Sequence, residues 1–302
     1  MEQIRRLNAY FKEKYNKKIY KIALSGSNTC PNRDGTIGTG GCIFCSGGSG
    51  EFSVPSQGSV DEQIEQGIKK ISSKVKGEAG YIAYFQAYTG TYGDLENLEK
   101  IYMAAAKNPN IEALSIGTRP DCLDENVMEM LVRLNEIKPL MIELGLQTSK
   151  KKSIEYIHRG YDNEIYEQAV KKLRSCGIEV IVHVILGLPG ETKEDMLNTI
   201  RYVNGTDIQG IKLQLLHVLE GTDMAADYRA GKIEVLSLEE YGDILCEVLE
   251  NLREDIVVHR ITGDGPKKIL LAPKWSGDKK KVLNYINRLI SDRNIIQGRR
   301  CK

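Results

Sequence analysis

The sequence lacks the apolar runs that secreted and membrane proteins carry. Its first 20 residues are polar, and no later stretch approaches the ~20 apolar residues of a membrane-spanning helix. The cysteines number seven, and an odd count in a chain without a signal argues against a disulfide framework. We therefore expect no secretory signal, no membrane partner, and a reducing, cytoplasmic setting.

Aromatic residues other than tyrosine are scarce, and neither an internal repeat nor a low-complexity linker interrupts the chain. One Trp and four Phe stand against fifteen Tyr among 302 residues, of which 41% are hydrophobic. That hydrophobic share supports a large buried core and excludes a fibrous or disordered chain. The length exceeds that of a typical domain, yet α/β barrels often use it as one unit.

Charge is distributed unevenly although the net charge is only +1. Residues 267–302 contain eleven Lys or Arg and two Asp, a balance of +9, so the other 266 residues carry −8. A basic tail on an acidic body is either a solubilising surface or a docking site for a polyanion such as RNA. The composition alone leaves both interpretations open.

Short apolar runs alternate with amphipathic stretches through most of the chain. We expect strands at 19–24, 81–86, 113–118, 141–146, 179–186 and 211–216, and helices at 60–74, 95–106, 125–135, 165–176, 193–203 and 238–253. Six such units predict an α/β fold, a partial (β/α)6 TIM-like barrel whose active face lies at the carboxyl ends of the strands. We place an N-terminal helical extension at 1–20, the barrel at 21–255 and a basic C-terminal extension at 256–302.

Three cysteines follow the first predicted strand within one glycine-rich loop. Cys30, Cys42 and Cys45 have the spacing C-x11-C-x2-C, and the next possible ligands, Cys122 and His158, are far along the chain. Structural zinc normally takes four protein ligands, whereas three thiolates leave one iron of a [4Fe–4S] cluster open. The amine and carboxylate of S-adenosylmethionine can chelate that iron, and an electron from the cluster then yields a 5′-deoxyadenosyl radical. A zinc loop or a set of unliganded thiols remains the alternative.

Several segments resemble the radical S-adenosylmethionine (SAM) superfamily. Residues 20–45 and 259–275 are most similar to the YhcC-like group, while 117–121, 143–148, 158–161 and 183–192 resemble the catalytic subunit of Elongator more distantly. The resemblance implies the radical SAM core barrel and its two cofactors, a [4Fe–4S] cluster and SAM. It also implies an electron donor such as flavodoxin or ferredoxin. It assigns no role to the block 259–275.

The chain departs from the superfamily pattern at two places. Most members have three residues between the first two cysteines, not eleven. The second strand of many members ends in a Gly-Gly-Glu segment that binds the methionine amine, where this chain has residues 86–91. Gln86 and Thr89 are the candidates to replace that acceptor.

The resemblance implies further contacts with SAM. Glu143 would accept hydrogen bonds from the ribose hydroxyls, Gln147 would contact the ribose or the methionine group, and Arg159 would pair with the methionine carboxylate. The alternatives are a solvated strand-end carboxylate, a surface amide and an ordinary ion pair.

Four more residues are expected around the adenine. Ile185 and Gly187 occupy the strand that runs along adenine in this superfamily, and Leu215 and His217 would flank the same ring. The alternatives are a turn glycine and ordinary core packing. Cys122, at the end of the third predicted strand, is a candidate substrate-linking or radical-quenching thiol.

The Elongator-like segments imply chemistry on the wobble uridine of tRNA, at its C5 substituent. The basic tail and the many tyrosines are compatible with phosphate contacts and base stacking. A radical SAM enzyme acting on a small metabolite or a peptide is the second hypothesis. A non-catalytic iron–sulfur or zinc protein that binds RNA is the third.

Overall fold

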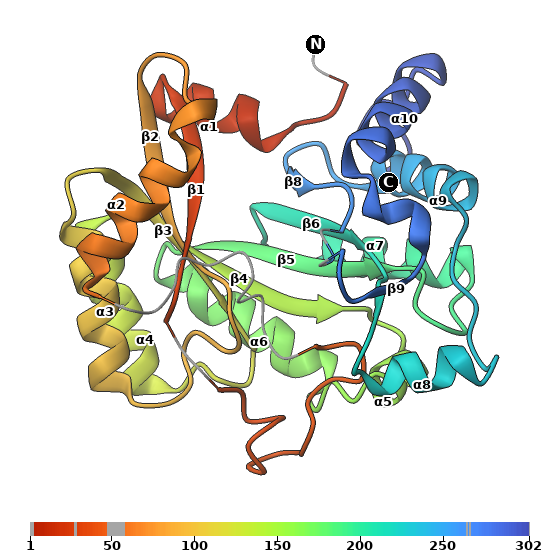
Figure 1. Ribbon diagram of the computed structural model, residues 1–302, viewed down its shortest axis with the longest axis horizontal. Coiled ribbons are helices and arrows are strands. Elements are labelled where there is room, and N and C mark those ends of the chain that lie inside the picture. The colour runs from red at the N-terminus through yellow and green to blue at the C-terminus, as the bar shows by residue number, and fades with distance from the viewer. Residues whose placement is uncertain (1–2, 27–28, 47–57, 264, 266, 302) are drawn as a thin grey trace.

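The computed structural model describes residues 3–26, 29–46, 58–263, 265 and 267–301, and its centre is one curled parallel sheet (Figure 1). In spatial order the strands are β1 (Lys18–Leu24), β2 (Ala79–Phe85), β3 (Ile111–Thr118), β4 (Leu140–Gln147), β5 (Glu179–Leu186), β6 (Gly210–Leu215) and β8 (Val257–Arg260). The six predicted strands are confirmed within a few residues, and so is the partial barrel. Strand β8 was not predicted, since four residues are too few for a periodic pattern.

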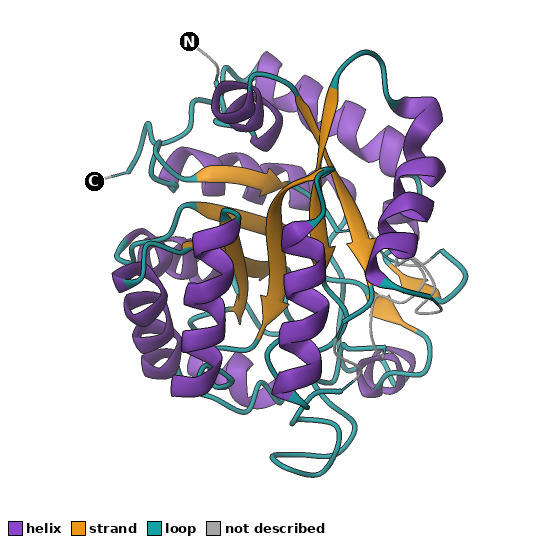
Figure 2. Cartoon of the chain, turned by 90° about the vertical axis from the view of Figure 1, so that its left-hand side faces the viewer, coloured by secondary structure: helices purple, strands orange, loops and turns teal. Residues whose placement is uncertain are grey.

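Helices cover the outer, convex face of the sheet (Figure 2). They are α2 (Val60–Ile71), α3 (Leu95–Lys107), α4 (Glu125–Ile137), α6 (Asn163–Ser175), α7 (Lys193–Asn204) and α9 (Leu238–Asn251), with the shorter α5 (Lys151–Tyr156) and α8 (Asp223–Arg229) near the carboxyl ends of the strands. Ser59, Thr192 and Ser237 begin α2, α7 and α9 with capping boxes, in which the N-cap side chain and the residue three positions on satisfy each other's backbone N–H. No helix in the described ranges is both long and apolar enough to cross a membrane.

The two ends of the chain meet beside β8. Helix α1 (Leu7–Tyr15) contacts β1 and β8, which are the edge strands of the sheet, and Arg6 pairs with Val258. Helix α10 (Lys279–Asp292) packs on α9 and buries Val282, Ile286 and Ile290. The predicted boundaries at residues 20 and 255 stay a prediction, although β8 and the buried face of α10 lie within the segment expected to be an extension.

The inside of the barrel is layered, because every second residue of a strand points inward. Near the amino ends the inward residues are apolar and form a floor with Phe11 of α1: Ile19, Ile82, Ala113, Met141 and Ile181. Two residues further along each strand lies what we call the polar layer: Lys21, Tyr84, Ser115, Glu143, His183 and Lys212. A second two-stranded sheet, β7 (Val218–Leu219) with β9 (Leu270–Ala272), lies beyond the carboxyl end of β6.

Candidate active site

A cavity of about 890 Å³ joins the polar layer to the loops at the carboxyl ends of the strands. Its walls include Cys30, Cys42 and Cys45, which all come from the loop after β1. Its size is near the upper end of the ~300–1,000 Å³ found for ligand sites. The structure therefore brings the three predicted cluster ligands to the predicted face.

The cysteine loop is held in place by backbone contacts and by one arginine. The Ile43 N–H donates to the Ile157 carbonyl at 3.2 Å, and the Ile43 carbonyl accepts from Met224 N–H at 3.0 Å. Arg33 donates to the Cys45 carbonyl at 3.2 Å. Its side chain passes so close to Gly41 that a Cβ there would lie 2.9 Å from it, and Gly41 also has a φ of +87°.

The surroundings of the cysteine loop shift the pKa of one of its three thiols. Burial, together with the nearby Cys45 thiol, raises the pKa of Cys42 to about 11, and a bound metal reverses such a shift. In the part of the chain that the structure describes, no three Cys, His, Asp or Glu side chains are gathered tightly enough to hold one metal ion. Three thiolates can each bind one iron of a [4Fe–4S] cluster and leave the fourth iron open.

Gln147 ends β4 in a left-handed backbone conformation with φ of +66°, which residues other than glycine rarely adopt. Its side chain folds over Gly145, where a Cβ would lie 2.8 Å from the amide nitrogen. The amide oxygen is buried and has no hydrogen-bond partner among the described residues, although Gln147 lines the cavity. A buried acceptor left open beside the cysteine loop fits a bound donor from SAM.

The other predicted SAM contacts are only partly brought together. Gln86, Thr89, Ile185, Leu215 and His217 line the cavity. Gly187 does not line it, and a Cβ on Gly187 would lie 2.8 Å from Leu236 instead. Glycine is required at this position because Leu236 approaches it closely. The predicted contact of Gly187 with adenine stays a prediction.

Arg159 is a buried structural residue, with a relative exposure of 1%. It donates to the carbonyls of Tyr161, Leu146 and Thr148 at 2.7–2.9 Å and to Asn163 Oδ1 at 2.9 Å. Four of its five N–H groups are thereby used to join the end of β4 to α6. Its predicted pairing with the methionine carboxylate stays a prediction, with one N–H left for it.

Arg119 is a site residue that was not predicted from the sequence. It follows β3, lines the cavity, pairs with Asp121 at 2.7 Å and lies 4.9 Å over the ring of Tyr161. The Arg-Pro-Asp sequence was visible, but nothing in it indicated that the guanidinium faces the cysteines. Cys122 is half-buried, and burial raises its pKa to about 12.

Glu143 is the centre of the polar layer, and its side chain is fully buried. Oε1 accepts from Lys21 Nζ at 2.9 Å and Ser115 Oγ at 2.7 Å, while Oε2 accepts from Tyr84 OH at 3.0 Å and His183 Nε2 at 2.8 Å and pairs with Lys212. These contacts occupy the acceptor sites of a carboxylate, so a ribose hydroxyl would have to displace one. The predicted contact of Glu143 with ribose stays a prediction.

The ionisation of the polar layer follows from these contacts. Although burial raises it, the pKa of Glu143 is held well below its usual range by Lys21, Lys212 and the His183 hydrogen bond. Burial, with the neighbouring Lys212, lowers the pKa of His183 to about 4. His183 is therefore neutral near pH 7, with Nε2 as the donor to Glu143 and Nδ1 3.3 Å from Gln214 Nε2.

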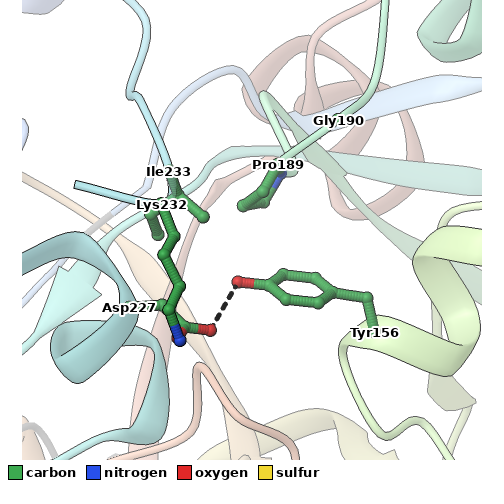
Figure 3. Close-up of a pocket in the computed structure, with 6 residues that line it drawn as sticks. All are labelled: Tyr156, Pro189, Gly190, Asp227, Lys232 and Ile233. Atoms are coloured by element: carbon green, nitrogen blue, oxygen red, sulfur yellow. Dashed lines mark hydrogen bonds and ion pairs between the residues drawn. The ribbon is translucent and has the colours of Figure 1, made fainter. Parts of the chain in front are cut away.

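A second hollow of about 400 Å³ lies between α5, α8 and the loop after β5 (Figure 3). Tyr156 donates to Asp227 at 3.1 Å, and Lys232 pairs with the same carboxylate at 2.9 Å. The one carboxylate lining this hollow is thus already paired. No cysteine or histidine is among the described residues that line it.

The fold, the cysteine loop and the cavity define a radical SAM protein. The family model described as "Radical SAM superfamily" matches residues 25–203, and the one described as "Radical_SAM C-terminal domain" matches residues 208–291. The chain belongs to the radical SAM superfamily, which uses a [4Fe–4S] cluster and SAM.

Its relatives confirm the resemblance to the YhcC-like group. The chain is 41% identical to YtqA of Bacillus subtilis, over 97% of this chain and 91% of that protein. It is 34% identical to YhcC of Escherichia coli, over 93% of this chain and 90% of that protein.

More distant similarities reach proteins with other names. Identity to the tRNA uridine(34) acetyltransferase of Methanocaldococcus jannaschii is 26%, over 59% of this chain and 32% of that protein. The solved structure of Elp3 from Methanocaldococcus infernus superimposes with a TM-score of 0.68 at 18% identity, covering 94% of this chain and 65% of that one. At that identity the superposition shows a common fold.

Proposed function

We propose that this chain reductively cleaves SAM at a [4Fe–4S] cluster held by Cys30, Cys42 and Cys45, and that it modifies tRNA. The observation that carries the proposal is the single cavity shared by the three cysteines and the unpartnered amide oxygen of Gln147. When bound, the reduced cluster supplies the electron that breaks a carbon–sulfur bond of SAM and releases a 5′-deoxyadenosyl radical. The electron comes from a donor protein, for which we propose a flavodoxin or a ferredoxin.

The residues around the cavity would bind and orient SAM. Gln147 Oε1 accepts from a ribose hydroxyl or from the methionine amine, and Gln86 and Thr89 supply further acceptors beside it. Ile185 and Leu215 offer apolar surface to the adenine, with His217 next to them. Arg159 acts mainly by holding the end of β4, and hence Gln147, in position.

Reaction with a macromolecule is compatible with the charge around the cavity. Arg33, Lys70, Lys74 and Arg119 are among its lining residues, and together they favour a polyanion. Tyr88, also on the cavity wall, is 37% exposed and available for stacking on a base. The partial similarity to a tRNA uridine(34) enzyme supports tRNA as the substrate, with the C5 substituent of the wobble uridine as its site.

The basic tail contributes less charge than its composition implies. Arg293 pairs with Asp243 at 2.7 Å, Arg299 with Glu250 at 3.3 Å, and Arg300 with the same Glu250 at 2.9 Å. The exposed Lys280 and Lys281 at the start of α10 have no carboxylate partner within 4.0 Å among the described residues. They are the tail residues that we propose to contact tRNA phosphates.

The cleavage reaction is tested with anaerobically reconstituted protein, dithionite and SAM. We expect 5′-deoxyadenosine by chromatography from the intact protein and from Cys176→Ala, whose cysteine lies on the outer face. Cys45→Ala should yield none and should bind less iron. Absence of 5′-deoxyadenosine from intact, iron-loaded protein would remove the enzyme proposal and leave a non-catalytic iron–sulfur protein.

The substrate is tested by comparing the modified nucleosides of tRNA from cells with and without the gene. A nucleoside that disappears on deletion, and returns with the intact gene but not with the Cys45→Ala form, supports tRNA. Identical nucleoside profiles would favour a small metabolite or a peptide. Filter binding of tRNA to Lys280→Glu/Lys281→Glu tests the tail, since deletion of α10 would also remove Val282, Ile286 and Ile290 from the core.

A further inference from the structure

The interior of the barrel has an excess of positive charge. Lys21 of β1, Lys212 of β6 and Arg260 of β8 all line the cavity. Glu143 is the one carboxylate among the described residues that line it. His183 and His259 add no negative charge, and burial lowers the pKa of each, so both are neutral near pH 7. Burial lowers the pKa of Lys212 well below its usual range, against the opposing effect of Glu143. One carboxylate therefore faces three basic side chains.

Two of these cations lie side by side on neighbouring strands. Lys212 is directly opposite Arg260 in the register of β6 and β8, and it is opposite His183 on its other side. Like charges directly opposite each other in a sheet are destabilising. Arg260 has no compensating contact, since it makes no hydrogen bond or ion pair within the described ranges.

A purely structural role would not require this arrangement. Two residues nearer the amino end of each strand, the floor of the barrel is filled by the apolar residues Ile19, Ile82 and Met141, as barrel interiors usually are. A single Lys–Glu pair would leave the layer without net charge. Replacing even such a buried pair by apolar residues often leaves the stability of a protein unchanged or increases it. Both lysines share the single carboxylate of Glu143, so Arg260 in particular is left without an opposite charge.

We infer that Lys21, Lys212 and Arg260 form a subsite for a compact anionic group of the substrate, a carboxylate or a phosphate. Lys21 keeps 19% of its side chain exposed, whereas the Glu143 side chain has no exposed surface. An anion entering the cavity thus meets the lysine before the carboxylate. The planar fork of Arg260 can bind two oxygens of either group at once.

The subsite is distinct from the one proposed for SAM. His183 of the polar layer precedes Ile185 by one inward position of β5, and Glu143 precedes Gln147 by two inward positions of β4. The methionine end of SAM would lie at the cysteine loop, beyond the carboxyl ends of these strands. An anion bound in the polar layer would anchor the substrate beneath that reacting end. This inference rests on the proposed function in one respect: the radical is taken to form at the cysteine loop, above the bound anion.

The test measures anion binding directly, by calorimetry on reconstituted protein saturated with SAM. The probes are inorganic phosphate and pyrophosphate in one arm, and acetate and succinate in the other. The variants are Lys21→Met and Arg260→Met, and Lys69→Met is the matched control, because it removes the same charge from the exposed face of α2. Arg260 has no partner to lose, so its variant should fold even if Lys21→Met does not.

We expect at least one probe to bind the intact protein, with its affinity reduced tenfold or more in Arg260→Met and unchanged in Lys69→Met. The arm that binds identifies the group as phosphate or carboxylate. No binding by any probe, or equal affinity in Arg260→Met and Lys69→Met, would overturn the inference. The cleavage assay on the intact protein is independent: anion binding without 5′-deoxyadenosine would contradict the proposed function but not this subsite.

Discussion

His183 Nε2 on β5 lies 2.8 Å from Glu143 Oε2 on β4, inside the barrel, where the Glu143 side chain has no exposed surface and the His183 side chain keeps 15% exposed. The neutral imidazole donates this hydrogen bond, because burial lowers the pKa of His183 to about 4. The pair therefore couples the stability of the barrel to pH and to the charge on one carboxylate.

We expect the protein to lose stability as the pH falls from 7 to 5. An unfolded histidine takes up a proton near pH 6.5 while His183 in the folded barrel does not until about pH 4, so the unfolded state binds more protons across this window. The contribution of His183 to the free energy of unfolding should fall by about 2 kcal/mol between pH 7 and pH 5. Urea unfolding of the intact protein and of His183→Gln at the two pH values measures it. His259 acts in the same direction, so the variant should show a smaller loss, and an equal loss in both would contradict the prediction.

Replacing Glu143 by glutamine should destabilise the barrel by about 3–5 kcal/mol, because Lys21 and Lys212 would then be buried without a counter-charge. The free energy of unfolding in urea is the measurement. Glu99→Gln is the control: its pair with Arg133 is on the surface, and such pairs contribute at most about 1 kcal/mol. Equal losses in the two variants would mean that the network contributes no more than a surface pair.

Arg159→Lys should lower the free energy of unfolding by about 3 kcal/mol. Lysine cannot reproduce the fork that reaches the carbonyls of Leu146, Thr148 and Tyr161, and the acceptors left behind are buried. Arg288→Lys, on the exposed side of α10, should change it by less than about 0.5 kcal/mol. Retention of full stability by Arg159→Lys would show that these hydrogen bonds are dispensable.

Gln147→Leu should weaken SAM binding about tenfold, since one neutral hydrogen bond contributes ~1 kcal/mol and the lost partner is left unsatisfied. Calorimetric titration of SAM into anaerobically reconstituted protein gives the affinity. Gln66→Leu, at an exposed position of α2, should bind SAM as the intact protein does. Unchanged affinity in Gln147→Leu would exclude Gln147 from the SAM site.

The sequence was sufficient to predict the strands, most of the helices and the position of the cysteine loop. Each predicted strand is a short apolar run with turn residues at its ends, and that pattern is local. The four-residue β8 was missed because its pairing with β6 depends on residues more than 40 positions away. Composition also overstates the charge that the tail presents, since it counts Arg293 and Arg300 but not the carboxylates of α9 that they meet.

By itself the sequence determined the order of the βα units and the spacing Cys30, Cys42 and Cys45, because both are written in consecutive residues. Only the tertiary structure decided which polar side chains share the inside of the barrel. Lys21, Glu143 and Lys212 are spread over nearly 200 residues, and no local pattern relates them. They meet because successive parallel strands bring every second residue to one interior, where each charge is set by the charges that the other strands contribute.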